Sequence, residues 1–166
     1  VLYISPLRAL AFDVEKNLRS PLMGIRLAAE RLGVPFLEPT VAMRTGDTSP
    51  KDRQALARRP VDLLITTPES LLLMVSTIRG RLALGEIETV IVDEVHAMVD
   101  NRRGTLLFAA LERLTRSAGE FRRIALSATV RPLDAVAAFI AGTGPDGRPR
   151  AMEIVEAAQD KRIELD

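Results

Sequence analysis

The sequence predicts an α/β fold in which a parallel sheet carries helices on both faces. Four short apolar runs recur along the chain, and a polar turn and a helical pattern follow each of them: Val1–Ile4, Val61–Ile65, Thr89–Val92 and Ile124–Leu126. Runs this apolar suit strands that are covered on both faces. Strands that alternate with helices in this way favour parallel order, because each helix carries the chain back to the start of the next strand.

The remaining elements have weaker signals. Two more strands are predicted at Thr40–Arg44, which lies between Pro39 and Gly46, and at Met152–Val155. The predicted helices, two of them separated by an interruption near Pro21, are Leu7–Leu18, Leu22–Leu32, Pro68–Val75, Leu106–Arg116 and Leu133–Ala141. Ligands bind outside the carboxyl ends of the strands in such sheets, so functional residues are expected directly after each strand.

Composition narrows the classes of protein and of site. The chain has 166 residues, 47% of them hydrophobic, with a formal net charge of +1, which is the balance of one globular domain without a basic or acidic tail. It has no cysteine and a single histidine, His96, which excludes disulfides, cysteine-ligated zinc and two-histidine metal sites within this chain. The longest aliphatic run, Leu71–Val75, is far shorter than the roughly 18 residues of a membrane span, so we expect a cytoplasmic protein with no membrane partner.

Two adjacent acids, Asp93 and Glu94, follow the most apolar predicted strand. A Walker B element needs this arrangement: the first carboxylate can hold Mg²⁺, directly or through water, and the second can orient or deprotonate the water that attacks a γ-phosphate. An Asp-Glu pair after a strand can also simply cap the following helix. His96, taken alone, is better explained by a structural role than by a catalytic one.

Polar residues also follow the other predicted strands. The segments concerned are Ser5-Pro6-Leu7-Arg8-Ala9-Leu10, Thr45-Gly46-Asp47, Thr66-Thr67-Pro68-Glu69-Ser70 and Ser127-Ala128-Thr129. Pro68 near the start of a helix leaves backbone N–H groups free to face an anion such as a phosphate. Each short segment, taken alone, is also compatible with ordinary loop chemistry.

Taken in chain order together with Asp93-Glu94-Val95-His96, these segments resemble motifs Ia, Ic-like, Ib, II and III of the first RecA-like domain of superfamily 2 helicases. Within these helicases, the chain is most similar to the large helicase-related (Lhr) branch of DEAD/DExH-box proteins. This similarity rests on Arg102-Arg103-Gly104, on Leu111-Glu112-Arg113-Leu114 and on the residues that extend the Ser127-Ala128-Thr129 segment to Leu133. The resemblance covers nearly the whole chain. It implies a RecA-like P-loop NTPase fold and an ATP-dependent helicase that uses ATP and Mg²⁺.

The resemblance also implies roles for individual residues. Asp93 matches the magnesium-associated acid, Glu94 the catalytic acid, and His96, Ser127 and Thr129 the link between nucleotide state and strand binding. The positions that match contacts to the nucleic-acid backbone are Pro6, Arg8, Gly46, Thr67 and Pro68. Backbone contacts read phosphate, so single-stranded or partly duplex DNA or RNA is the expected partner. A 3′-to-5′ direction of travel and a role in DNA repair or RNA processing are further implications of the Lhr branch.

No Gly-x-x-x-x-Gly-Lys-Ser/Thr loop occurs in the sequence, and the chain opens on Val1 within a predicted strand. We therefore expect a fragment: residues 1–158 form a RecA-like domain incomplete at its N-terminus, and residues 159–166 begin a linker to a second RecA-like domain. That second domain of the parent chain is an expected partner. Because phosphoryl transfer needs charges that reside outside these residues, the fragment alone is expected to be inactive.

Two other functions fit part of the pattern. A non-catalytic nucleic-acid-binding or interaction module could keep the RecA-like shape without a P-loop. A phosphoacceptor receiver domain is also a small parallel α/β unit with acids at strand ends, but it needs a lysine after a late strand. Lys161 is the only candidate, and it lies in a polar tail.

Overall fold

The computed structural model describes residues 1–59, 61–128 and 131–156, and the chain divides into two compact units, Val1–Val130 and Arg131–Asp166. Among the described residues, no helix is both long enough and apolar enough to cross a lipid bilayer.

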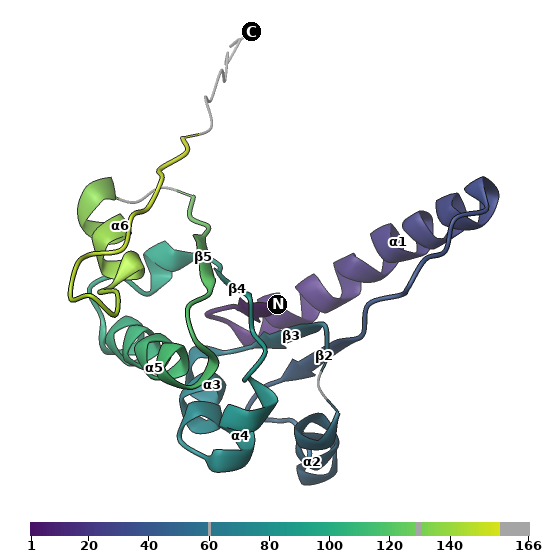
Figure 1. Ribbon diagram of the computed structural model, residues 1–166, viewed down its shortest axis with the longest axis horizontal. Helices are drawn as coiled ribbons and strands as arrows, with labels where there is room; N and C mark the ends of the chain where they lie inside the picture. Colours follow the sequence, from purple (N-terminus) through teal and green to yellow (C-terminus); the bar gives the residue numbers. More distant parts are fainter. Residues whose placement is uncertain (60, 129–130, 157–166) are drawn as a thin grey trace, which may run out of the picture. The chain divides into compact units, whose positions relative to one another are not determined.

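A five-stranded sheet forms the centre of the first unit (Figure 1). Its strands are β1 (Leu2–Ile4), β2 (Val41–Arg44), β3 (Leu63–Thr66), β4 (Thr89–Val92) and β5 (Arg122–Ala125). They lie in the order β2-β3-β1-β4-β5, and every neighbouring pair is parallel. The predicted parallel α/β class is therefore confirmed, and so is the weakly signalled strand β2.

The register brings the carboxyl ends of the strands to one edge. Ile4 pairs with Thr66 on one side and with Val92 on the other, and Val92 pairs with Ala125. Backbone bonds continue past the strands: the Asp93 N–H donates to the Ile4 carbonyl at 2.9 Å, and the Ser5 N–H donates to the Thr66 carbonyl at 3.0 Å. The loops that carry the predicted functional residues therefore start side by side.

Helices lie on both faces of the sheet, as predicted. The helices of the first unit are α1 (Arg8–Leu32), α2 (Pro50–Arg58), α3 (Pro68–Val75), α4 (Ile78–Ala83) and α5 (Arg102–Ala118), with a short 3₁₀ turn, η1 (Val95–Ala97). The crossover through α1 runs toward β2, whereas the crossovers through the later helices run the other way. Right-handed crossovers in opposite directions place α1 on one face and α2 to α5 on the other. The helices α2 and α4 were not predicted, although Ser49 and Thr77 are N-cap residues that accept bonds from the first helical turn.

Helix α1 is a single helix, which corrects the predicted break into two helices near Pro21. Proline removes one backbone donor from a helix and normally kinks it. Both Pro21 and Asn17, whose carbonyl lies one turn earlier, are exposed, so water can satisfy the freed acceptor. The distal part of α1 extends well beyond the sheet (Figure 1). Gly33 ends it in the left-handed conformation, at φ 64°.

The core of this unit lies between the sheet and α3 and α5. Alternate residues of the two central strands, Leu2 and Ile4 of β1 and Val90 and Val92 of β4, are almost completely buried. The facing stripe of α5 supplies Leu107, Leu111 and Leu114, which are fully buried at helical spacing. Each such side chain contributes roughly 1.5–3 kcal/mol when it is removed from water.

The second unit contains the predicted helix α6 (Leu133–Ala141) and a hairpin-like turn closed by an antiparallel bridge between Thr143 and Pro149. Arg150 stabilises the turn through a 2.9 Å bond from its guanidinium to the Ala141 carbonyl. The strand predicted at Met152–Val155 is wrong: this segment forms no strand among the described residues, and both Ile154 and Val155 are exposed. A short apolar run needs a partner strand to become part of a sheet.

Candidate functional site

Asp93 is the first residue after β4, and two groups hold its carboxylate in place. The Tyr3 hydroxyl donates to Asp93 Oδ2 at 2.6 Å, and the Glu94 backbone N–H donates to Asp93 Oδ1 at 2.9 Å. Partial burial raises the pKa of Tyr3, and the bond to the Asp93 carboxylate raises it further, so the phenol stays protonated and remains a donor. Each carboxylate oxygen keeps a free lone pair for a further ligand. Tyr3 was not singled out from the sequence.

Glu94 has a left-handed backbone, with φ 48° and ψ 45°. This conformation is uncommon for residues other than glycine, asparagine and aspartate, and it turns the chain sharply from β4 into η1. Glu94 Oε2 then lies 3.2 Å from His96 Nδ1. The side chains of Glu94 and His96 are both a little more than one-third exposed, so they can reach solvent and ligand.

His96 connects the loop after β4 to the loop after β5. Its Nδ1 lies 3.3 Å from Ser127 Oγ, and the Val95 N–H donates to the Leu126 carbonyl at 2.9 Å. His96 Nδ1 therefore lies within hydrogen-bonding distance of both Glu94 Oε2 and Ser127 Oγ. Thr129, the other hydroxyl predicted to take part, lies outside the described residues. We call Asp93, Glu94, His96 and Ser127 the acidic edge.

The acidic edge suits a magnesium ion that is shared with phosphates. Within the described ranges, no three His, Cys, Asp or Glu side chains gather closely enough to hold a metal ion by themselves. Mg²⁺ keeps several waters and usually takes one or two carboxylates together with substrate phosphates. The half-buried and rigidly oriented Asp93 carboxylate fits that role.

The residues predicted to contact a nucleic-acid backbone differ in exposure. Gly46 and Arg8 are exposed, and Arg8 forms an ion pair with Asp47 that joins the loop after β1 to the loop after β2. Pro6, Thr67 and Pro68 are buried. The Thr67 hydroxyl accepts from the Ser70 N–H at 3.4 Å as the N-cap of α3, so this side chain is occupied within the fold.

Arg103 lies near the start of α5 and bonds to residues that follow β1 and β3. In the sequence it was noted only within Arg102-Arg103-Gly104, a segment similar to the Lhr branch. Its Nε donates to Glu69 Oε1 at 2.5 Å, and its Nη2 donates to the Pro6 carbonyl at 2.7 Å. Partial burial would raise the pKa of Glu69, but the bonds from Arg103 and the backbone outweigh burial and lower it. Arg103 therefore anchors the loop after β1 to the first turn of α3.

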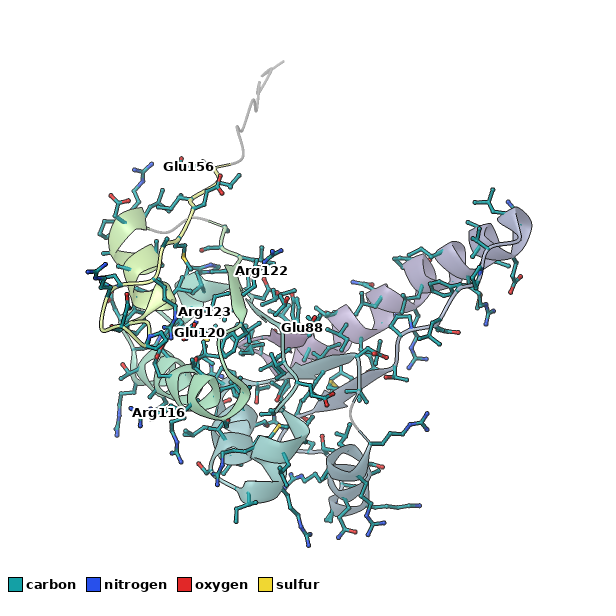
Figure 2. The ribbon with its side chains drawn as sticks, viewed as in Figure 1. Glu88, Arg116, Glu120, Arg122, Arg123 and Glu156 are labelled. Atoms are coloured by element: carbon teal, nitrogen blue, oxygen red, sulfur yellow. The ribbon has the colours of Figure 1, made fainter. Side chains whose placement is uncertain are left out.

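Gly104 lets α5 approach the loop that follows the acids. A Cβ atom at this position would lie 1.7 Å from the Met98 carbonyl oxygen, so no other residue fits without a shift of the backbone. Arg123 of β5 also lies beside this helix (Figure 2) and forms a 2.8 Å ion pair with Glu112. The two contacts seat α5 against the loop after β4 and against the edge strand.

The model of the DEAD/DEAH box helicase family matches residues 1–136 of this chain. An ATP-dependent helicase Lhr-Core protein 2 of Thermococcus barophilus is 47% identical over 165 residues, which are 99% of this chain and 19% of that protein. An Lhr helicase of Mycolicibacterium smegmatis is 53% identical over 146 residues, which are 87% of this chain and 10% of that protein. The chain thus spans between a tenth and a fifth of the length of these relatives.

A solved structure of the Mycobacterium smegmatis helicase Lhr, bound to single-stranded DNA and AMP-PNP, matches with a TM-score of 0.82 at 52% identity. The match covers 87% of this chain and 19% of the Lhr chain. The family match includes all five strands and both loops of the acidic edge. The chain belongs to the DEAD/DEAH box helicase family and, within it, is similar to the Lhr helicases.

Proposed function

We propose that this chain is part of the motor core of an ATP-dependent DNA or RNA helicase or translocase. In this proposal, residues 1–158 belong to the first RecA-like domain and residues 159–166, which lie outside the described residues, begin the link to a second one. The chain contributes the acids that hydrolyse Mg-ATP and contacts to a nucleic-acid backbone. The observation that carries the proposal is the connected arrangement of Asp93, Glu94, His96 and Ser127 at the carboxyl edge of a parallel sheet.

The two acids have different roles in this mechanism. Asp93, held by Tyr3 and by the Glu94 N–H, would bind Mg²⁺ directly or through water. The ion, when bound with ATP, supplies positive charge to the phosphates. Glu94 lies one residue further, on a turned backbone, and would orient or deprotonate the attacking water as a general base.

His96 and Ser127 would transmit the nucleotide state to the strand-binding loops. His96 Nδ1 lies 3.2 Å from Glu94 Oε2 and 3.3 Å from Ser127 Oγ. A movement of Glu94 when phosphate leaves would alter these contacts and hence the position of the loop after β5. Thr129 is proposed to act with Ser127, as the resemblance implies.

The nucleic-acid backbone would cross the loops after β1, β2 and β3. Arg8 is exposed and can exchange its Asp47 partner for a phosphate. Gly46 leaves its backbone open to a strand, and the buried Pro6, Thr67 and Pro68 would shape the neighbouring loops that the strand crosses. The relative bound to single-stranded DNA supports a single strand as the ligand. The proposed second RecA-like domain would complete the groove.

The test is ATP hydrolysis by the full-length protein, with and without single-stranded DNA or RNA, for wild type, Asp93→Ala and Glu94→Gln. We expect turnover that a strand stimulates in wild type and a loss of about 100-fold or more in both variants. The strand that stimulates better identifies the substrate. Strand binding without turnover in wild type would contradict a motor and would support the non-catalytic binding module.

A further inference from the structure

A groove of about 500 Å³ lies beside the edge strand β2 and between α2 and α4, and no residue of the acidic edge lines it. Its charged lining consists of four arginines, which we call the arginine groove: Arg44, Arg53, Arg58 and Arg79. Small or polar residues such as Gln54 and Thr77 complete the wall, and no acid lines it among the described residues. A local excess of positive charge is notable in a chain whose net charge is +1.

The four arginines lack acidic partners. Across the part of the chain that the structure describes, none of them has a carboxylate oxygen within 4.0 Å. The nearest acid in sequence, Asp52, instead accepts from the Ser49 hydroxyl at 2.7 Å. Arg53 Nε is buried without an acceptor among the described atoms. Burial, and then repulsion by Arg53, lower the pKa of Arg44.

Like charges held together without a counter-charge reduce the stability of a fold, so such an arrangement indicates a ligand that supplies the missing charge. The guanidinium group forms paired bonds with phosphate oxygens and is weakly hydrated, which suits it to phosphate. A protein partner would also need buried apolar or aromatic contacts. No aromatic side chain lines the groove, and its uncharged lining includes Ala57 and Gly80.

A hydrogen bond links the groove to the loop after β2. Arg53 Nη2 donates to the Gly46 carbonyl at 2.7 Å, so one arginine of the groove is bonded to a loop proposed to contact the nucleic-acid backbone. We propose that the arginine groove binds the phosphates of a nucleic-acid strand that continues past the Gly46 loop. This inference rests on the proposed function, and it extends the strand path along the edge of the sheet.

The experiment compares wild type with the double variant Arg58→Gln/Arg79→Gln in the full-length protein. Both side chains are exposed, so their replacement leaves the core intact. Fluorescence anisotropy measures the affinity for single-stranded oligonucleotides of increasing length, each at several salt concentrations. The matched control is Arg31→Gln/Arg113→Gln, which removes two exposed arginines from α1 and α5.

We expect the wild-type affinity to rise with strand length to a plateau, and the double variant to reach its plateau at a shorter length. For long strands the double variant should bind about 10-fold more weakly at 0.1 M salt. The slope of log affinity against log salt should fall by about 1.4, since each lost phosphate contact on a single strand removes about 0.7. The control variant should match wild type.

An unchanged length dependence and an unchanged salt slope in the double variant would overturn the proposal that the arginine groove binds a nucleic-acid strand. So would a loss of affinity for inorganic tripolyphosphate or for a polyglutamate peptide without any loss for long oligonucleotides, because the ligand would then be a free phosphate compound or an acidic protein. Failure of the proposed function has a different result: wild type would show no ATP turnover with any strand. A single variant, Arg79→Gln, should show about half of the change in slope.

Discussion

The acidic edge and the arginine groove differ in how their charged side chains are paired. In the acidic edge the side chains bond to one another: Tyr3 holds Asp93, and His96 faces both Glu94 and Ser127. In the arginine groove four cations line one cleft without a carboxylate, among the residues that the structure describes. The first region is organised before any ligand arrives, whereas the second is completed only by an anion.

This difference shows how reaction chemistry and strand binding place different demands on a fold. A group that stabilises a transition state must be oriented in advance, because reorganisation during the reaction costs rate. A group that follows a flexible phosphate backbone gains more from unpaired charge than from fixed direction. Four substitutions would break or sharpen the comparison.

Gly104→Ala should have the largest effect, because it pushes α5 away from the loop that follows the acids. The added Cβ would meet the Met98 carbonyl oxygen at 1.7 Å. We expect a loss of about 2–4 kcal/mol in the free energy of unfolding, measured with urea. The matched control is Gly24→Ala in α1, where nothing lies within 4 Å of the new atom, and it should stabilise by about 0.5–1 kcal/mol. Equal effects at the two glycines would contradict this account.

Tyr3→Phe tests whether the acidic edge is organised in advance. The change removes the 2.6 Å bond to Asp93 and leaves the ring in place. We expect strand-stimulated kcat to fall about 10-fold and the Mg²⁺ concentration for half-maximal rate to rise several-fold, with about 1 kcal/mol lost in stability. The control is Ser76→Ala, which removes a 2.7 Å hydroxyl bond to the Leu72 carbonyl far from the edge. An unaltered Mg²⁺ dependence in Tyr3→Phe would show that Tyr3 does not position the acid.

Arg103→Gln tests the anchor between the loop after β1 and α3. Both partners of the Arg103–Glu69 pair are more than one-third exposed, so solvent screens it and we expect only about 1 kcal/mol of destabilisation at pH 7. Because the folded-state pKa of Glu69 is lowered, its contribution is present above the ordinary value of about 4.3 and is lost as the pH falls through the folded pKa. The stability difference between wild type and Arg103→Gln should therefore shrink below about pH 4.3. A difference that stays constant between pH 7 and pH 3.5 would contradict the role of the ion pair.

Gln54→Glu should have the smallest effect on stability, and it should change stability and strand affinity in opposite directions. It places a carboxylate in the wall of the arginine groove, one helical turn before Arg58. We expect thermal unfolding to report a gain of about 0.3–0.5 kcal/mol, as for an i,i+4 pair, while affinity for long single strands falls several-fold. The control, Gln54→Ala, should leave strand affinity close to wild type. A stabilised variant with unchanged strand affinity would separate the groove from nucleic-acid binding.

The alternation of apolar runs with helical patterns was sufficient to predict the sheet and most of its helices. It failed where one signal was taken alone. Pro21 suggested a break, but its exposed position leaves the freed carbonyl to water and α1 continues to Leu32. The apolar run Met152–Val155 suggested a strand, yet it pairs with none of the strands in the described ranges. Whether a proline breaks a helix, and whether a short apolar run forms a strand, depends on the surrounding structure and not on the local sequence alone.

The sequence by itself determined the parallel α/β class, the order of the strand-end segments and the candidate acids Asp93 and Glu94, because these are local patterns with a set spacing. Tertiary structure alone decided that Tyr3 holds Asp93, 90 positions away, that Arg103 joins Pro6 to Glu69, and that four arginines share one groove. These contacts join residues that are distant in sequence. Strand order, register and helix placement bring these residues together. A pattern of residues that are neighbours in sequence does not predict which distant residues will be in contact.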